Sequence, residues 1–193
     1  MRAPKTLAAA LAILCLPLSL VAETASAAPA VIPNPFNSGD TAFILIASAM
    51  VLLMTPGLGL FYGGMVRKKN VLSTLMHSFL MLAIISLVWI VIGYSLAFSP
   101  SGHFHNLIGD FSYFMLHGVG EAVDTRYAPT IPHLVFMAFQ MKFAIITVAL
   151  ISGALAERVK FSAFMLFALL WSLVVYSPVC RWVWGPDGFL RLN

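Results

Sequence analysis

Three aromatic residues give the clearest indication of chemistry in this sequence: Phe139, Phe143 and Trp184. Phe139 and Phe143 are one helical turn apart, so their rings follow one face of a helix, and Gln140 and His133 lie near that face. A small cation between desolvated rings gains about 2 kcal/mol or more from each of them. The alternative is ordinary packing, with Phe139 and Phe143 in a core and Trp184 as an anchor at a membrane interface.

The sequence does not contain the motifs of the common enzyme classes. HExxH, CxxC, GxSxG and a phosphate-binding loop are absent, and the long apolar segments contain no acidic residue. We therefore predict that the protein is not an enzyme and that it uses neither a metal nor an organic cofactor. Two cysteines, Cys15 and Cys180, are too few for a disulfide scaffold. The Lys and Arg residues are scattered in small groups, which argues against nucleic-acid binding.

Two ionisable side chains, His77 and Lys142, fall inside apolar segments. Lys142 follows His133, at the start of the third span, by enough helical residues to lie ~13 Å inside the membrane. Inserting a lysine at depth costs about 2.5–3.5 kcal/mol on insertion scales. Its ammonium group lines a wet vestibule, pairs with a distant acid, or extends back to the surface, and the sequence leaves these three alternatives open. We expect His77 to be a packing histidine rather than a ligand.

Composition determines the class of protein that must position these residues. The chain has 193 residues, of which 61% are hydrophobic and 9% are charged, whereas a soluble domain has about 25% charged residues. A helix that crosses a bilayer needs about 20 apolar residues, and four segments satisfy this requirement. We predict an all-α, polytopic membrane helix bundle with spans at about 41–66, 71–98, 133–156 and 161–184.

The positive charges predict the orientation of these spans. The loops at 67–70 and 157–160 are short and basic, whereas 99–132 is long and carries both signs of charge. Because basic residues concentrate in cytoplasmic loops, we expect both short loops inside the cell. The long loop and the mature N-terminus are then outside.

The first 27 residues have the pattern of a secretory signal peptide. Arg2 and Lys5 precede an apolar run, and Ala25 and Ala27 provide small residues for cleavage. The alternative, an uncleaved first membrane helix, gives the same sidedness. Residues 28–40 are rich in proline and polar residues and are predicted to form an exported tail.

Small residues in the spans predict close helix packing. Gly59 and Gly63 form a GxxxG pair in the first span, and Gly153 is one of several small residues in the third. Pro56, between Thr55 and a glycine, is expected to kink or locally unwind the first span, because proline lacks a backbone N–H group. A plain packing groove is the expected role of the GxxxG pair.

The ordered series of motifs resembles the ammonium transporter family. The similar segments are 54–58 (MTPGL), 60–67 (LFYGGMVR), 69–73 (KNVLS), 93–98 (GYSLAF), 139–140 (FQ), 153–158 (GALAER), 161–162 (FS) and 182–185 (WVWG). Their order, their spacing and the charge pattern agree across the mature chain. The domain at 41–193 is therefore expected to have an ammonium-transporter-type fold, and the alanine–proline–alanine start of the mature chain also fits bacterial members.

The resemblance implies a channel-like transporter in the bacterial inner membrane. Family members are trimers, each protomer recruits ammonium or methylammonium at an outer vestibule of aromatic rings, and neutral ammonia then crosses a narrow path past two histidines. Phe139, Phe143 and Trp184 match the aromatic residues of the outer site, and Phe143 also matches one ring of the family's phenylalanine gate. A PII-type signalling protein is the partner expected at the cytoplasmic face.

Two features depart from the family pattern. Lys142 occupies a position where a small or hydroxyl residue is usual, and its positive charge should repel ammonium unless it points away from the vestibule. The family's aspartate-containing stretch, pore histidines, second gate phenylalanine and vestibule serine correspond to positions beyond Asn193. We therefore expect an incomplete transporter domain, covering the first four spans, that does not take up methylammonium by itself.

Two alternatives to a transporter stay open on the sequence alone. The chain could be a non-transporting membrane interaction subunit that assembles with, or regulates, full-length homologues through its small-residue helix faces. It could also be the unfolded product of a broken gene.

Overall fold

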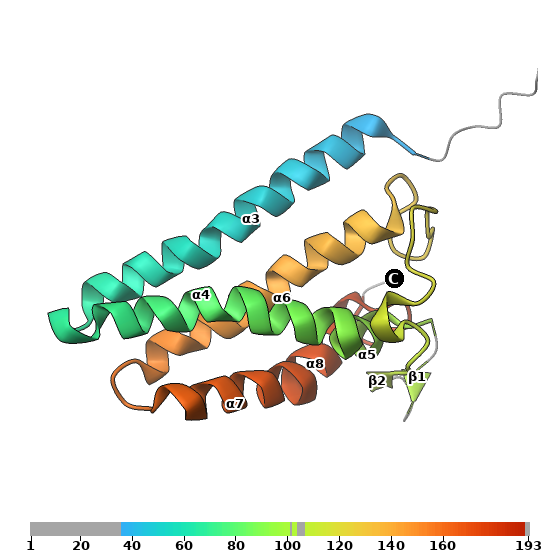
Figure 1. Cartoon of the computed structure of the whole chain (residues 1–193). Coiled ribbons are helices and arrows are strands. Elements are labelled where there is room, and N and C mark those ends of the chain that lie inside the picture. The colour runs from blue at the N-terminus through green and yellow to red at the C-terminus, as the bar shows by residue number, and fades with distance from the viewer. Residues whose placement is uncertain (1–35, 101, 104–106, 192–193) are drawn as a thin grey trace, which may run out of the picture. The chain divides into compact units, whose positions relative to one another are not determined.

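The computed structural model describes residues 36–100, 102–103 and 107–191, so the predicted signal peptide lies outside the described residues. Within these described residues, four helical segments are long and apolar enough to cross a membrane: Ser38–Met65, Lys68–Phe98, His133–Leu155 and Phe161–Trp184. Helix α3 (Ser38–Met65) packs against α4 (Val71–Val88) and α6 (His133–Leu155), and α4 also contacts α6 and α7 (Phe161–Trp171). These contacts confirm a polytopic helix bundle (Figure 1).

The connections divide the bundle into two ends. The turns after α3 and after α6 lie together at one end, the short-loop end, and the connection at 99–132 lies at the opposite, long-loop end (Figure 1). The long connection contains two short antiparallel strands, β1 (Gly102–His103) and β2 (Ile108–Gly109), and the 3₁₀ helix η3 (Phe114–Leu116). This connection packs on α5 (Tyr94–Phe98), the last turn of the second span.

Helix α3 begins at Ser38, within the segment expected to be an exported tail. The Asn37 side chain caps it by accepting hydrogen bonds from the backbone N–H groups of Gly39 and Asp40, at 2.9 and 3.2 Å. The expected unwinding at Pro56 does not occur, because α3 stays helical from Ser38 to Met65. A proline removes only one backbone donor from a helix, and the packing of α3 on two neighbours supports the helical turns around it.

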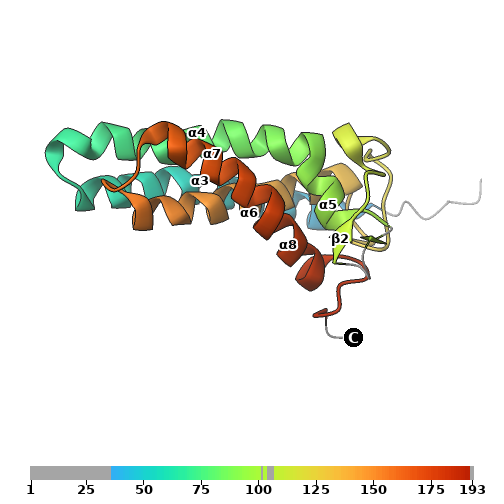
Figure 2. The same ribbon diagram turned by 90° about the horizontal axis from the view of Figure 1, so that it is seen from below.

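Two of the spans contain a π-helical turn. The second span runs from the 3₁₀ helix η1 (Lys68–Asn70) through α4, then the π turn η2 (Trp89–Gly93), to α5. The fourth runs from α7 through the π turn η4 (Ser172–Tyr176) to α8 (Ser177–Trp184), and it passes obliquely along α6 (Figure 2). A π turn holds one extra residue, so it rotates the following helix about its axis.

The core of the bundle combines large apolar side chains with small ones. Met81, Ile85, Trp89, Phe98 and Phe164 are almost wholly buried. Many apolar side chains on the outward face of α3 are exposed, which is the pattern of a helix that faces lipid or further helices.

The two loops of the short-loop end are joined by Glu157. Its Oε1 atom accepts hydrogen bonds from the backbone N–H of Arg67 at 2.9 Å and from Asn70 Nδ2 at 2.8 Å. These two hydrogen bonds lower the pKa of the Glu157 carboxyl group, and the bond from Asn70 has the larger effect. Glu157 has a φ of 63°, a left-handed conformation that is unusual for a residue other than glycine. The loop after α6 is therefore held in an unusual turn against the loop after α3.

Glycine allows the helices to approach closely at two places. An ideal Cβ on Gly153 would lie 2.4 Å from Tyr62 Cζ, so the Tyr62 ring lies directly on the backbone of α6. The Tyr62 hydroxyl also donates to the Leu150 carbonyl at 3.1 Å. On α3, a Cβ on Gly59 would lie 3.1 Å from Ser78 Cβ of α4, and Gly63 faces the same helix. The expected packing role of Gly59 and Gly63 is consistent with this geometry.

We predict that Gly153→Ala separates α3 from α6. The added methyl group overlaps the Tyr62 ring, and overpacking of this kind typically costs about 1–3 kcal/mol. The matched control is Gly64→Ala, because no heavy atom lies within 4 Å of a Cβ at that position. Thermal unfolding in a mild detergent should show a lower midpoint for Gly153→Ala than for Gly64→Ala. Equal midpoints would contradict the close contact.

Candidate aromatic cation site

A cavity of about 400 Å³ separates α6 from the fourth span, and aromatic rings form much of its wall. All three aromatic residues singled out in the sequence line it. The complete lining is Phe139, Gln140, Phe143, Thr147, Tyr176 and Trp184. The structure thus brings together side chains from the third span and from the second half of the fourth span.

Helix α6 provides one wall through residues spaced four apart. Phe139, Phe143 and Thr147 follow one face of the helix, and Gln140 lies beside them. The Phe139 and Phe143 ring centroids are 5.0 Å apart with an interplanar angle of 77°, an edge-to-face arrangement. The Thr147 hydroxyl donates to the Phe143 carbonyl at 2.6 Å, so its oxygen keeps a lone pair for the cavity.

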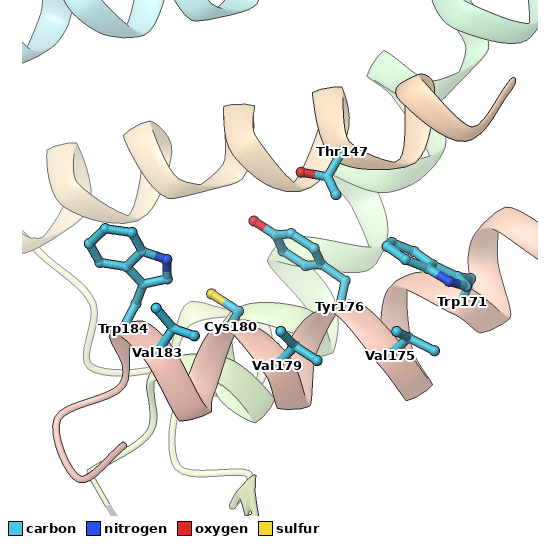
Figure 3. A pocket seen from close by; sticks show the side chains of 8 residues that line it. All are labelled: Thr147, Trp171, Val175, Tyr176, Val179, Cys180, Val183 and Trp184. Carbon is cyan, nitrogen blue, oxygen red and sulfur yellow. The ribbon is translucent and has the colours of Figure 1, made fainter. Parts of the chain in front are cut away.

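The opposite wall depends on the π turn η4. Tyr176 is its last residue, and Cys180 and Trp184 follow at intervals of four residues on α8. Figure 3 shows these three side chains on the side of α8 that faces α6, with the Tyr176 hydroxyl directed toward Thr147. They also line a smaller hollow of about 220 Å³. Sequence analysis missed Tyr176, Cys180 and Thr147, although the four-residue spacing back from Trp184 indicates this face.

The aromatic cavity continues toward the long-loop end. A neighbouring hollow of about 460 Å³ shares Phe139, Gln140 and Trp184 with it. Its other lining residues are Tyr127, Phe136, Val183, Leu190 and Arg191. Trp184 has 62% of its surface exposed, so its ring stands between the two hollows with a free face.

The lining of the inner cavity carries no charged side chain, whereas the outer hollow includes the Arg191 guanidinium. Aromatic ring faces carry partial negative charge, and the hydroxyl and amide oxygens nearby accept hydrogen bonds. No acidic side chain lines either hollow, so no carboxylate is present there to take up a proton or to bind a divalent metal. Among the described residues, no group of three or more His, Cys, Asp and Glu side chains forms a metal site.

His133 does not belong to the cavity, contrary to its place near the aromatic face in the sequence. Its Nε2 atom lies 2.5 Å from the Tyr94 hydroxyl, in a buried cluster beside α5. The Tyr127 ring stacks on the His133 ring with centroids 5.1 Å apart. The first turn of α6 is thereby attached to the second span, and His133 acts in packing at the head of the helix that carries Phe139.

The long connection positions Tyr127, which lines the outer hollow. Its hydroxyl donates to the Phe98 carbonyl, and burial raises the pKa of Tyr127, so the donor proton is retained. Arg126 contacts Asp124 through Nε at 2.9 Å and Nη2 at 2.6 Å, and it also donates to the Tyr113 hydroxyl at 3.1 Å. The Arg126 hydrogen bond lowers the pKa of Asp124.

Neither Lys142 nor His77 lines the aromatic cavity. Lys142 is half-buried on α6 and makes no hydrogen bond or ion pair with any residue in the described part of the chain. His77 packs against the rings of Phe161 and Phe164, with both pairs of centroids 5.0 Å apart. The Lys142 side chain therefore does not form part of the cavity wall.

Comparisons with known proteins agree with this architecture. Residues 42–193 match the sequence profile of the Ammonium Transporter Family. The chain is 55% identical over 147 residues to an ammonium transporter of Bacillus subtilis (strain 168), covering 76% of this chain and 35% of that protein. It is 51% identical over 157 residues to a putative ammonium transporter of Methanothermobacter thermautotrophicus, covering 80% and 37%. The chain thus spans about a third of the length of these relatives.

Solved structures show the same arrangement of helices. The crystal structure of Candida albicans Mep2 superposes with a TM-score of 0.73 at 35% sequence identity, over 81% of this chain and 33% of that one. Saccharomyces cerevisiae Mep2 gives the same TM-score and identity, over 81% and 34%.

We predict that the long connection loosens at acidic pH because of Asp124. A carboxyl group whose pKa is lowered by folding stabilises the folded state above its unfolded pKa of about 3.9, and this stabilisation is lost as the pH falls through the lower folded value. Hydrogen exchange at 110–130, corrected for intrinsic rates, should increase below about pH 4.

In the Asp124→Asn variant, hydrogen exchange at 110–130 should already be faster at pH 6 than in the unchanged protein. Its exchange rate should also depend less on pH. Glu121→Gln is the control, since Glu121 is exposed and has no hydrogen bond or ion pair among the described residues. An Asp124→Asn profile identical to that of the unchanged protein would refute the role of this ion pair.

Proposed function

Since the chain belongs to the ammonium transporter family, we propose that it serves the transport of ammonium and methylammonium across the inner membrane of a bacterial cell. The aromatic cavity between α6 and α8 is the observation that carries this proposal. Phe139, Phe143 and Trp184 are the cation-recruiting residues, and the Phe143 ring, below Phe139 on the same helix face, also serves as a gate.

Recruitment rests on cation–π attraction. An ammonium ion in the cavity would lie between the Phe139 and Phe143 rings of α6 and the Trp184 ring of α8. Such contacts contribute about 0.5–1 kcal/mol when exposed and about 2 kcal/mol or more when desolvated. The Tyr176 and Thr147 hydroxyls and the Gln140 oxygen supply acceptors for the ammonium N–H groups.

The proposed orientation places the long-loop end outside the cell and the short-loop end in the cytoplasm. Support comes from the exposed cations Arg67, Lys68, Lys69, Arg158 and Lys160, which gather at the short-loop end. The mature N-terminus is then outside, and the signal peptide at 1–27 directs its export. The aromatic cavity opens toward the outside, where it meets ammonium first.

We also propose that the complete assembly is a homotrimer and that a PII-type signalling protein binds its cytoplasmic face. The Glu157 hydrogen bonds support the second point, because they hold the two basic loops side by side as one surface. Exposed apolar residues along α3 offer a surface for helices of the same or another protomer.

We predict that methylammonium binds the purified chain in lipid nanodiscs and that the aromatic residues determine its affinity. Trp184→Leu and Phe139→Leu should each weaken binding by about 2- to 30-fold, which corresponds to about 0.5–2 kcal/mol per ring. Saturation-transfer NMR with ¹³C-methylammonium provides the measurement. Phe111→Leu is the control, because Phe111 is exposed on the long connection and lines neither hollow. Equal affinities for all three variants would contradict the proposed site.

The segments that match this chain cover 35% and 37% of the two named relatives, so the whole transport activity is proposed for a protein of their full length. We predict no methylammonium uptake in a transporter-deficient bacterial strain that expresses these 193 residues alone. Co-expression with the part of the Bacillus subtilis relative that this chain does not match should restore uptake. Uptake by the chain alone would contradict this prediction.

Failure to restore uptake, together with assembly of the two parts in a pull-down, would favour the alternative of a non-transporting interaction subunit. The Trp184→Leu chain is the matched control for restored uptake, because it removes one wall of the cavity and leaves the helix faces unchanged.

A further inference from the structure

Arg181 is a wholly buried charged residue at the end of α8, with 0% of its surface exposed. Its Nη1 atom donates to the Ser99 carbonyl at 3.0 Å. Its Nε and Nη2 atoms are buried without a hydrogen-bond partner among the described residues. A guanidinium stays protonated in proteins, so burying it costs several kcal/mol unless it is well paired. Packing alone does not require a charge at this position.

The Arg181–Ser99 bond joins α8 to the long connection. Ser99 is the residue at which α5 ends, and its hydroxyl accepts a hydrogen bond from the Asp110 N–H at 2.8 Å. The Ser99 side chain therefore contacts strand β2 and Asp110, the residue after β2, whereas the Ser99 backbone carbonyl contacts α8. One arginine nitrogen thus ties α8 to a serine that already links α5 to the connection.

The backbone of Arg181 is enclosed as tightly as its side chain. Its carbonyl accepts the Gly185 N–H at 2.9 Å. Ideal Cβ atoms on Gly185 and Gly188 would lie 2.6 and 2.4 Å from that carbonyl oxygen, so the chain turns back directly over it. Trp184 lies between Arg181 and this turn, and its indole N–H makes no hydrogen bond among the described residues. Its position depends on how the α8 end is held.

We propose that Arg181 is a positioning residue for the aromatic cation site: its bond to Ser99 fixes the end of α8 so that Trp184 faces Phe139 and Phe143. This inference rests on the proposed function, because it names a further residue on which that site depends. Arg181 lines neither hollow and does not touch the cation.

The charge of Arg181 allows positioning to be separated from electrostatics by the sign of the effect. A fixed cation one helical turn from Trp184 repels ammonium. If charge were the main contribution, its removal would strengthen methylammonium binding. If positioning is the main contribution, its removal weakens binding, because Trp184 no longer holds its place.

The test compares three variants of the full chain in nanodiscs. Arg181→Met keeps the length of the side chain and removes every donor, and we expect methylammonium affinity to fall at least fivefold. Arg181→Lys keeps one donor for Ser99 and should bind with intermediate affinity. Trp182→Phe is the control: it removes the 2.8 Å bond from Trp182 Nε1 to the Leu107 carbonyl, which joins the same helix to the same connection, and it should change affinity less than twofold.

Unchanged or tighter binding by Arg181→Met would overturn the proposal. If Arg181→Met does not fold, the Arg181→Lys variant provides the test. The proposal would be overturned if Arg181→Lys bound methylammonium as tightly as the unchanged chain. It would also be overturned if Trp182→Phe lost as much methylammonium affinity as Arg181→Lys.

A second measurement is independent of ammonium. Cys180 precedes Arg181 and is 5% exposed, so its thiol reports on the packing of α8. In a Cys15→Ser background, Arg181→Met should increase the rate of maleimide labelling at Cys180 at least fivefold, while Trp182→Phe should not. Absent methylammonium binding in the unchanged chain would reject the proposed function, and equal labelling rates would reject the role of Arg181.

Discussion

The proposed function depends on one feature of the fold, which is that α6 and the end of the fourth span enclose an aromatic cavity between them. The cavity between α6 and α8 contains no acidic side chain, and its wall consists of aromatic rings, hydroxyl groups and one amide. Such a wall stabilises positive charge through ring quadrupoles and hydrogen-bond acceptors.

Backbone geometry places these side chains opposite one another. The π turn at Ser172–Tyr176 adds a residue to the fourth span, after which Tyr176, Cys180 and Trp184 face α6. The other π turn, at Trp89–Gly93, lies beside it, since a Cβ on Gly93 would be 3.8 Å from the Ser177 hydroxyl. The second and fourth spans thus each contain a π turn, and the two spans lie close to each other at this place.

The sequence was sufficient to predict the four spans and the three aromatic residues that now line one cavity, because hydropathy and four-residue spacing are local signals. It did not reveal the π turns, which leave no distinct periodicity in a segment that is apolar throughout. The partnership of His133 with Tyr94 and the burial of Arg181 were also missed, because each depends on a residue far away in the chain. Of the kink or local unwinding predicted at Pro56, the unwinding is absent, because α3 stays helical from Ser38 to Met65.

The central claim is that the Trp184 ring binds the ammonium ion through its π face, and a graded change in that face tests it most directly. Replacing Trp184 with mono-, di- and trifluorinated tryptophans withdraws ring electron density in steps while nearly preserving the size of the side chain. Cation–π binding predicts that the logarithm of methylammonium affinity falls in proportion to the number of fluorine atoms. Affinity that does not change across the series would contradict the account.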